Sequence, residues 1–303
     1  MKIALLGQAA FGEEVLEALL KDGEQVSVVY MPPDPPAGTA SNFKELAERS
    51  GIPVRQPPRM REPQVLAEYQ SFAPDLNVMA SVTDIVPATI LNYPRLGTIQ
   101  YHPSLLPRHR GGSAINWAII NGETKTGLSI FWPDEGLDTG PLLLQKEVPI
   151  EPDDTLGKVY FDKLFPLGVD ALRESVRLVR EGKAPKIPQD LSKGEYEPLC
   201  SRMTIDWMYP AGIAYNVIRG CNPSPGAVTS YQGRQLKIFD CEKLDISDPE
   251  APGTIKRVSE EGLVVAANGG TILVKRLQPE GSAKLKAWEF AASAGIRAGE
   301  RLG

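Results

Sequence analysis

The sequence predicts an α/β protein in which a Rossmann-like, mostly parallel sheet is followed by a smaller, OB-like β-barrel domain. Short apolar runs alternate with helical patterns over the first 180 residues, as in a parallel sheet with crossover helices. The composition then changes to a stretch rich in Gly and Pro, and the remainder consists mostly of short strands at close spacing. We therefore expect a first domain at residues 1–181, a linker at 182–206 and a barrel domain at 207–303.

In the first domain, strands are expected where short apolar runs are bounded by turn residues. These runs cover residues 2–6, 26–30, 76–80, 98–102, 128–132 and 142–149. Helical patterns follow the turn at residues 7–12, begin again at 42 and after 87, and cover 113–120 and 154–181. Pro166 is expected to interrupt the last helix, because proline lacks the N–H that a helix interior needs.

The turn at residues 7–12 begins and ends with glycine, which invites comparison with dinucleotide-binding loops. It lacks the Gly-x-Gly-x-x-Gly spacing of those loops, and no convincing acidic residue ends the second strand. Close packing between the first strand and the first helix explains these glycines better.

The second domain follows a segment that contains Gly182, Pro185, Pro188, Gly194 and Pro198, as a linker would. A helix is expected at residues 210–219, since proline suits a first helical turn. The strands of a small barrel are expected at residues 227–231, 236–239, 253–258, 262–266 and 271–277.

Charge and hydropathy exclude several classes of function. The formal net charge of −5 and the pI of about 5.3 argue against a protein that binds polyanions over its whole surface. From Trp207 onward, 12 Lys and Arg stand against 10 Asp and Glu, which is no basic patch. No run of 18 apolar residues is present, and the opening MKIALLG is too short for a signal peptide, so we expect a cytoplasmic protein without membrane contact.

The cysteine and histidine counts argue against disulfide and zinc sites. Cys200, Cys221 and Cys241 are widely spaced, as incidental thiols of a reducing compartment are. His102 and His109 are the only histidines of the sequence. With so few His and no Cys cluster, no metal cofactor is expected.

The most informative stretch, QYHPSLLPRHRGG, begins at Gln100 and includes the end of a predicted buried strand. Open parallel sheets bind ligands beyond the carboxyl ends of their strands. Some 36 residues after His102, another strand is followed by DEGLDTG, which contains Asp138. A His and an Asp delivered from two strand ends can meet across one crevice.

Such a pair suits acyl transfer to an amine or to water. Attack on a formyl carbon places negative charge on the carbonyl oxygen, where a preorganised donor contributes on the order of 3 kcal/mol. His102 can be this donor, because a nearby carboxylate stabilises a protonated imidazole. Asp138 can accept the proton that leaves the nucleophile. The amide of Gln100 can supply a second, neutral donor.

Each of these residues also has a structural explanation when it is considered alone. A lone His near a strand end is more often structural than catalytic, and an Asp in a Gly-flanked loop usually serves the turn. Arg108 and Arg110 are most often solvated surface charges. The length of the two motifs, rather than any one residue, favours the catalytic interpretation.

As whole motifs, HPSLLPRHRG and DEGLDTG resemble the folate-dependent formyltransferase superfamily, typified by methionyl-tRNA formyltransferase. The longer segments YHPSLLPRHRGGSAINWAIINGE and LSIFWPDEGLDTGPLLLQKE are most similar to the N-terminal hydrolase domain of 10-formyltetrahydrofolate dehydrogenase. The segments IRGCNPSPGAVTSYQGRQLKIF, LVKRLQP and AGERLG resemble the C-terminal barrel of that superfamily, so the resemblance covers nearly the whole chain.

The resemblance implies an enzyme with the formyltransferase fold that uses 10-formyltetrahydrofolate as co-substrate. His102 takes the position of the catalytic histidine and Asp138 that of the catalytic aspartate. Ser104 takes the place of a serine that helps to order the site. The loops at residues 81–87 and 134–138 correspond to the walls of the pterin pocket. The residues expected to bind the cofactor there are Val82, Thr83, Ile85, Val86, Asp134, Glu135 and Leu137.

The chain departs from the pattern of its relatives at Gln100. The transferases carry Asn two residues before the histidine, whereas the hydrolase domain has an apolar residue there. Gln keeps the amide but is longer by one methylene, about 1.3 Å, and a 1 Å misplacement can lower a rate about a hundredfold. Water or an unusual acceptor therefore becomes more plausible.

The acceptor is left open among several alternatives. Water is favoured by the similarity around His102 and Asp138. Methionyl-tRNA is the runner-up, because small barrels can bind RNA. Against methionyl-tRNA, the loop at residues 31–41 has no Lys or Arg that could contact phosphates. The tRNA enzymes resemble one another in having a basic insertion at this place. A nucleotide-sugar amine is a third possibility, since INWAIINGETKTG also resembles sugar N-formyltransferases.

Two further alternatives receive less support. Glycinamide ribonucleotide is disfavoured, because the first turn lacks the Gly-Ser-Asn phosphate cradle of that family. A folate-binding regulatory protein without catalysis would not need both His102 and Asp138, and the sequence retains both.

Overall fold

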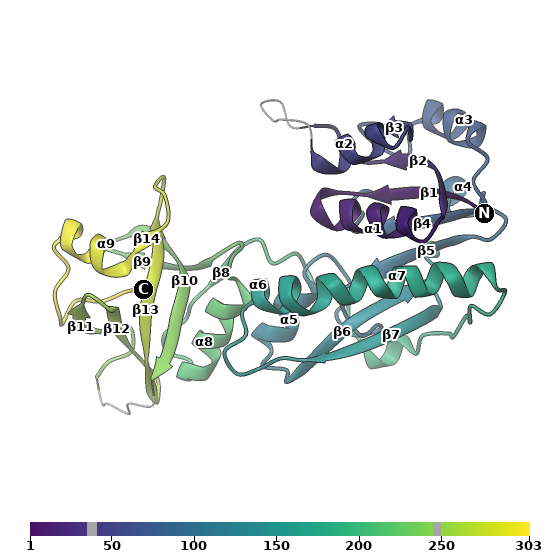
Figure 1. Cartoon of the computed structure of the whole chain (residues 1–303). Helices are drawn as coiled ribbons and strands as arrows, with labels where there is room; N and C mark the ends of the chain where they lie inside the picture. The colour runs from purple at the N-terminus through teal and green to yellow at the C-terminus, as the bar shows by residue number, and fades with distance from the viewer. Residues whose placement is uncertain (35–40, 245–249) are drawn as a thin grey trace. The chain divides into compact units, whose positions relative to one another are not determined.

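The computed structural model of the chain describes residues 1–34, 41–244 and 250–303 (Figure 1). Contacts divide the chain into two compact units. Unit 1 comprises Met1–Gly112, Gly127–Val148 and Lys163–Glu197, and unit 2 comprises Ser113–Thr126, Pro149–Asp162 and Pro198–Gly303. The chain thus enters unit 2 twice before its C-terminal part begins. The domain bounds predicted from the sequence, at residues 181 and 207, stay a prediction.

Unit 1 is built on a mostly parallel sheet. Its strands are β1 (Lys2–Gly7), β2 (Gln25–Tyr30), β3 (Val54–Arg55), β4 (Leu76–Ala80), β5 (Thr98–His102), β6 (Lys125–Phe131) and β7 (Leu142–Pro149). Their order is β3-β2-β1-β4-β5-β6-β7. The pairs from β3 to β5 are parallel, and β6 runs antiparallel to β5. The predicted fold class is confirmed, and the carboxyl ends of β1, β2, β4 and β5 lie along one edge.

The helices of unit 1 are α1 (Ala9–Lys21), α2 (Asn42–Arg49), α3 (Pro63–Ser71), α4 (Ala88–Leu91) and α7 (Phe165–Arg180). The glycines of the first turn serve close packing, as the sequence predicts. A Cβ on Gly7 would lie 3.2 Å from the Cα of Gly12, and one on Gly12 would lie 2.8 Å from the ring of Phe43. Helix α7 is tied to the end of α1 by a bidentate ion pair in which Arg173 donates to Asp22 at 2.6 and 2.7 Å.

The helical pattern predicted over residues 154–181 is interrupted just before Pro166. A short helix, α6 (Leu156–Lys158), is followed by a π-helical turn over Val159–Leu164, after which α7 begins. Pro166 lies in the first turn of α7, directly after this π-helical turn. In the described residues, no helix is long and apolar enough to cross a membrane.

Unit 2 combines a mixed sheet with three longer helices, among its described residues. Its strands are β8 (Met203–Thr204), β9 (Ala227–Tyr231), β10 (Arg234–Leu244), β11 (Ile255–Ser259), β12 (Gly262–Ala267), β13 (Gly270–Pro279) and β14 (Leu285–Lys286), and its longer helices are α5 (Ala114–Ile120), α8 (Ala211–Gly220) and α9 (Ala287–Ala294). The order is β11-β12-β13-β10-β9-β8, and β14 pairs with β13. Only the β8–β9 pair is parallel among the described pairs. Near the end of the chain, Leu302 bridges Tyr231 and Arg301 bridges Thr254.

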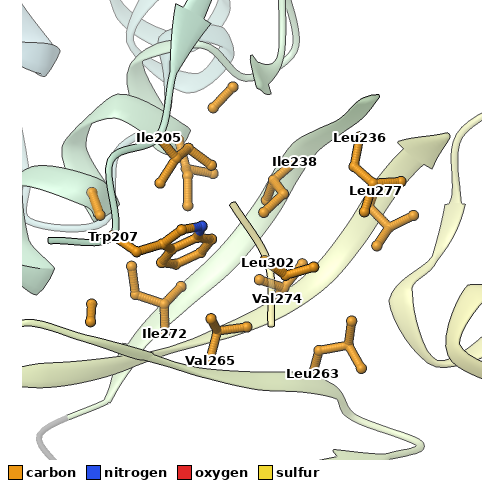
Figure 2. Packing of buried hydrophobic residues seen from close by; sticks show 14 of the residues in the cluster. Ile205, Trp207, Leu236, Ile238, Leu263, Val265, Ile272, Val274, Leu277 and Leu302 are labelled. Carbon is orange, nitrogen blue, oxygen red and sulfur yellow. The ribbon is translucent and has the colours of Figure 1, made fainter. Parts of the chain in front are cut away.

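The core of unit 2 forms between this sheet and its helices. Figure 2 shows Trp207 among aliphatic side chains of the strands, including Ile238, Val265 and Ile272. The indole is 4% exposed, and its N–H donates to the Thr229 hydroxyl at 3.0 Å. Burial of such side chains contributes about 1.5–3 kcal/mol each, so this cluster is the main source of stability of unit 2.

Helices α5 and α8 pack closely within unit 2. The side-chain amide of Asn116 donates to the carbonyl of Gly220 at 2.8 Å, and a Cβ on Gly220 would lie 2.8 Å from Ile120. Only glycine therefore fits at the end of α8 without a shift of α5. The hydroxyl of Ser113, expected to cap α5, accepts instead from the backbone N–H of Cys200 at 2.9 Å.

Candidate active site

The two residues with the strongest sequence signal, His102 and Asp138, lie side by side in unit 1. His102 is the last residue of β5, and its side chain is 7% exposed. Its Nδ1 lies 3.6 Å from Oδ2 of Asp138, whose side chain is also 7% exposed. An imidazole and a carboxylate from two strand ends are thus brought together away from bulk water, where charges interact more strongly than at the surface.

The orientation of the His102 imidazole follows from the contact of Nε2. Nε2 of His102 lies 2.9 Å from the backbone carbonyl oxygen of His109, which can only accept a hydrogen bond. Nε2 therefore carries a proton and donates. Nδ1 is left facing the carboxylate of Asp138.

The position of Asp138 depends on its backbone. Its φ of +56° lies in the left-handed region, which few residues other than glycine adopt. Its Oδ2 accepts a hydrogen bond from the backbone N–H of Gly111 at 2.9 Å. Gly111 itself has a φ of +108°, and a Cβ there would lie 2.7 Å from the carbonyl oxygen of Glu197. The carboxylate is therefore held by an N–H that only a glycine can present in this position.

Ser104 lies in the loop that follows β5 and is fully buried. Its hydroxyl donates to the carbonyl of Arg108 at 2.6 Å, and its own carbonyl accepts from the hydroxyl of Ser129 at 2.6 Å. Gln145 donates to the same Ser129 hydroxyl at 2.9 Å. These bonds close the loop that carries His109, which supplies the acceptor for His102. The ordering role implied for Ser104 stays a prediction, and the contacts support it.

Gln100 lies two residues before His102 on β5 and is partly buried. Since side chains alternate along a strand, Gln100 and His102 point to the same face of the sheet. The role of Gln100 as a second donor stays a prediction.

A cavity of about 230 Å³ lies at the carboxyl ends of β1, β2 and β4. Val82 and Thr83 of the predicted pterin wall line it, together with Gln8, Tyr30 and Asp84. Tyr30 is 2% exposed, and its hydroxyl has no hydrogen-bond partner among the described residues. Burial raises the pKa of this phenol above its usual range, so the hydroxyl keeps its proton. The cavity has none of His102, Asp138 and Gln100 in its lining.

The other residues predicted to bind the cofactor do not line this cavity. Val86 is 7% exposed and packs in the core with Ile90, whereas Ile85 is 72% and Leu137 55% exposed. Asp134 and Glu135 stand at the start of the loop that carries Asp138. Asp134 accepts from the N–H of Gly136 and from the Thr139 hydroxyl, so it also shapes this loop. Their contact with a cofactor stays a prediction.

The sequence interpretation missed two residues that hold the site, Gln189 and Glu197. The amide of Gln189 donates to the carbonyls of Asp138 and Gly140, at 3.0 and 2.6 Å. Oε1 of Glu197 lies 3.2 Å from Nδ1 of His109. Both residues lie in the segment predicted as a linker, and contacts to main-chain carbonyls leave no residue pattern that could have revealed Gln189.

No group of three or more His, Cys, Asp or Glu that could hold a metal ion is present in residues 1–34, 41–244 and 250–303. The groups placed against the His102 ring are the carboxylate of Asp138 and the carbonyl of His109, and Gln100 shares its face of the sheet. Such a set can bind and release protons and can donate hydrogen bonds to an oxyanion.

Two family models match the chain. The model described as formyl transferase matches residues 1–167, and the model described as formyl transferase, C-terminal domain, matches residues 201–295.

The relatives include two kinds of protein. The cytosolic 10-formyltetrahydrofolate dehydrogenase of Mus musculus is 41% identical over 96% of this chain, which spans 34% of the dehydrogenase. The methionyl-tRNA formyltransferase of Syntrophus aciditrophicus is 38% identical over 100% of this chain and 99% of its own length. The chain thus spans about a third of the dehydrogenases that it matches.

Solved structures share the fold at low sequence identity. HypX from Aquifex aeolicus, solved in complex with tetrahydrofolic acid, superposes with a TM-score of 0.72 at 17% identity, over 97% of this chain and 47% of that one. An N-formyltransferase from Helicobacter canadensis superposes with a TM-score of 0.68 at 18% identity. The superposition covers 92% of this chain and 99% of that one. Since a family model spans more than half of the sequence and a relative matches it from end to end, the chain belongs to the formyl transferase family.

Proposed function

We propose that the protein cleaves 10-formyltetrahydrofolate with water as the acceptor, and releases formate and tetrahydrofolate. The observation that carries this proposal is the buried pair of His102 and Asp138, with Nδ1 and Oδ2 3.6 Å apart at the edge of the sheet where ligands bind. The cavity at the carboxyl ends of β1, β2 and β4 lies at the same edge of the sheet and is lined by Val82 and Thr83 of the predicted pterin wall, whereas the catalytic pair itself lies outside its lining.

In the proposed reaction, water attacks the formyl carbon while Asp138 accepts one of its protons. His102 donates a hydrogen bond through Nδ1 to the oxygen on which negative charge develops. The tetrahedral intermediate then collapses, the bond from carbon to N10 breaks, and Asp138 returns its proton to N10. The formic acid that remains loses its proton to solvent, and formate and tetrahydrofolate leave. Each preorganised donor to the oxyanion contributes on the order of 3 kcal/mol to such a step.

Water is preferred as acceptor for two reasons. The chain has Gln100 where the transferases that it resembles have Asn, which changes the reach of the amide by about 1.3 Å, enough to disturb the alignment of an amine. In addition, the loop at residues 31–41 contains no Lys or Arg for phosphate contacts, although residues 35–40 lie outside those that the structure describes.

Methionyl-tRNA is the second candidate acceptor. The observation in its favour is the match to a methionyl-tRNA formyltransferase over the full length of both chains. The fold shared with a sugar N-formyltransferase leaves a nucleotide-sugar amine as a further possibility. We place the reaction in the cytoplasm, where free folates and tRNA both occur.

The test begins with the purified protein and 10-formyltetrahydrofolate, with formate and tetrahydrofolate as the measured products. His102→Ala and Asp138→Ala should each lower the rate by about two orders of magnitude or more, as the loss of a catalytic proton carrier does. Asp22→Asn, which changes a carboxylate on the outer surface of unit 1, is the matched control. Rates within about threefold of the wild type in both site variants would refute the assignment.

The acceptor is tested by adding charged initiator tRNA or small amines to the same assay. We expect formate release to continue at an unchanged rate. Formation of formylmethionyl-tRNA far faster than water-only turnover would overturn the choice of water. Gln100→Asn should raise the ratio of transfer to hydrolysis, and an unchanged ratio would show that the amide takes no part.

A further inference from the structure

We propose that Gln189 is a positioning residue that keeps Asp138 within reach of His102. Its side-chain amide carries two hydrogens, and each has a carbonyl acceptor: that of Asp138 at 3.0 Å and that of Gly140 at 2.6 Å. Both acceptors belong to the loop between β6 and β7. The expected effect of Gln189 on the rate rests on the proposed function, whereas its expected effect on the position of Asp138 rests on the contacts alone.

The loop between β6 and β7 needs hydrogen bonds that hold it in place, because its backbone is strained at one residue. Asp138 adopts a φ of +56°, and a residue other than glycine in this region costs of order 1–3 kcal/mol unless its surroundings impose it. The ends of the loop are joined by the hydrogen bond from the N–H of Trp132 to the carbonyl of Pro141 at 2.9 Å. Gln189 binds the loop between those ends, next to the strained residue.

The backbone on both sides of Gln189 is held in place by hydrogen bonds. Two residues earlier, Ile187 exchanges both of its main-chain hydrogen bonds with Leu142 of β7, at 2.8 and 2.9 Å. One residue later, the Asp190 side chain accepts from the N–H and the hydroxyl of Ser192. The amide is therefore presented to the loop by a segment that is anchored on both sides.

The same segment also holds the His102 half of the site. Arg110 exchanges main-chain hydrogen bonds with Glu195 and Glu197, at 3.1 and 2.9 Å. The carboxylate of Glu197 contacts the ring of His109, whose carbonyl accepts the hydrogen bond from His102. Residues 187–197 thus fasten the two loops whose side chains form the pair, and Gln189 is the side chain that contacts the Asp138 loop directly.

The chemistry of Gln189 makes its amide hydrogens the important feature. Its Oε1 is buried and has no partner among the described residues, so this side chain is oriented by donation and not by acceptance. Methionine has nearly the same length and volume but no donor. Gln189→Met therefore removes the two hydrogen bonds while it fills the same space, and Gln189→Ala removes both the bonds and the volume.

The first measurement uses nuclear magnetic resonance and does not depend on turnover. The sequence has two histidines, so the imidazole signals of His102 are assigned with a single His102→Ala variant. In Gln189→Met and Gln189→Ala, we expect the His102 signals to move toward those of Asp138→Asn, because the carboxylate leaves its place. Unchanged His102 signals in Gln189→Met would overturn the proposal, whatever the activity of the protein.

The second measurement is a double-mutant cycle on the rate of formate release. Gln189→Ala should lower the rate roughly 10- to 100-fold in the wild-type background, because displacement of a reacting group by about 1 Å has that effect. In the Asp138→Asn background the same change should lower it less than about twofold, since Gln189 then has no carboxylate to position. Gln278→Ala, which removes an amide bound to the turn carbonyl of Ser282 in unit 2, is the control and should leave the rate unchanged.

The outcomes separate the two proposals. Equal rate losses in both backgrounds would show that Gln189 is merely structural and would overturn the positioning role. A wild-type protein that releases no formate would refute the proposed function, while the His102 signals would still decide whether Gln189 positions Asp138.

Discussion

The hydroxyl of Tyr30 shows at the scale of one residue what an unpaired polar atom does inside a core. A buried hydroxyl without a partner costs about 1–3 kcal/mol, and a core does not normally retain one. Tyr30 borders the cavity beside Val82 and Thr83, but its hydroxyl is buried and packs in the core of unit 1, so the unpaired hydroxyl lowers the stability of the protein.

Tyr30→Phe should therefore stabilise the protein. Its free energy of unfolding should rise by about 1 kcal/mol, because a polar group no longer lies buried without a partner. The affinity for folate should stay within about twofold of the wild type, because the buried hydroxyl does not contact a ligand. Urea denaturation and titration with tetrahydrofolate measure the two quantities. A loss of stability, or a several-fold loss of affinity, would contradict this account of Tyr30.

Gly111 gives a second prediction at this scale. Gly111→Ala should lower the rate of formate release at least tenfold, because a Cβ would lie 2.7 Å from the carbonyl of Glu197 and would displace the N–H that binds Asp138. Gly212→Ala is the matched control, because no atom lies within 4 Å of the added carbon and the position is helical. The control should be neutral or slightly stabilising. Steady-state rates and thermal denaturation of both variants test this.

The site residues show which roles a sequence reveals. His102 and Asp138 follow buried strands in recognisable motifs, so their meeting could be predicted. Gln189 could not, because its acceptors are main-chain carbonyls 49 and 51 residues away, and any residue supplies a carbonyl. The same limit hid Gly111, whose need for glycine comes from the distant carbonyl of Glu197.

At the scale of elements, the sequence predicted strands and helices correctly where the pattern of apolar residues was long. The strands Leu76–Ala80, Thr98–His102 and Ala227–Tyr231 have the predicted bounds, because each is an apolar run that ends at turn residues. The strands β3, β8 and β14 were missed, since two residues are too few for a period of two to appear. Helices α3 and α9 were missed as well, and their existence depends on packing rather than on a strong pattern.

The ion pair between α1 and α7 leads to a prediction about pH. Hydrogen bonds from the Arg173 guanidinium lower the pKa of the Asp22 carboxyl below its usual value. A carboxyl whose pKa is lowered in the folded state adds stability above its unfolded pKa, and that stability is lost as the pH falls through the folded value. Asp22→Asn should therefore cost about 0.5–1 kcal/mol at pH 7, as exposed bidentate pairs do.

The cost of Asp22→Asn should shrink below about pH 4 and vanish once the carboxyl of the wild type is protonated. Urea denaturation of both proteins between pH 2.5 and pH 7, values chosen to bracket the usual Asp pKa of about 3.9, measures this difference. A difference in unfolding free energy that is constant over this range would show that the ion pair adds nothing and that the substitution acts in another way.

At the scale of the whole molecule, the chain enters unit 2 early, with Ser113–Thr126 and again with Pro149–Asp162. The sequence does not signal these entries, because both segments read as ordinary parts of the alternation of strands and helices. Contacts between distant parts of the chain decide the division. The Tyr215 hydroxyl donates to Asp153, and the Arg219 guanidinium donates to the carbonyl of Asp154, both within unit 2.

A cut between Ser201 and Arg202, both exposed, should therefore leave one particle. The first piece retains α5 and Asp154, and the second retains α8, so the contacts within unit 2 join them. After cleavage at an engineered protease site, both pieces should elute together in size-exclusion chromatography and separate only in denaturant. Gly220→Val, which forces α8 against Ile120, should weaken this association. Pieces that separate in plain buffer would contradict the division.

The fit of Gly220 against α5 also restricts how such genes can recombine. A crossover near codon 200 would give a chimera with the α5 of one parent and the α8 of another. Because the amide of Asn116 donates to the carbonyl of Gly220 and a Cβ at position 220 would lie 2.8 Å from Ile120, parents that differ at position 116, 120 or 220 would yield hybrids in which α5 and α8 fit poorly. Exchange of the C-terminal half between relatives is thus expected to succeed only when residues 113–126 are inherited with it.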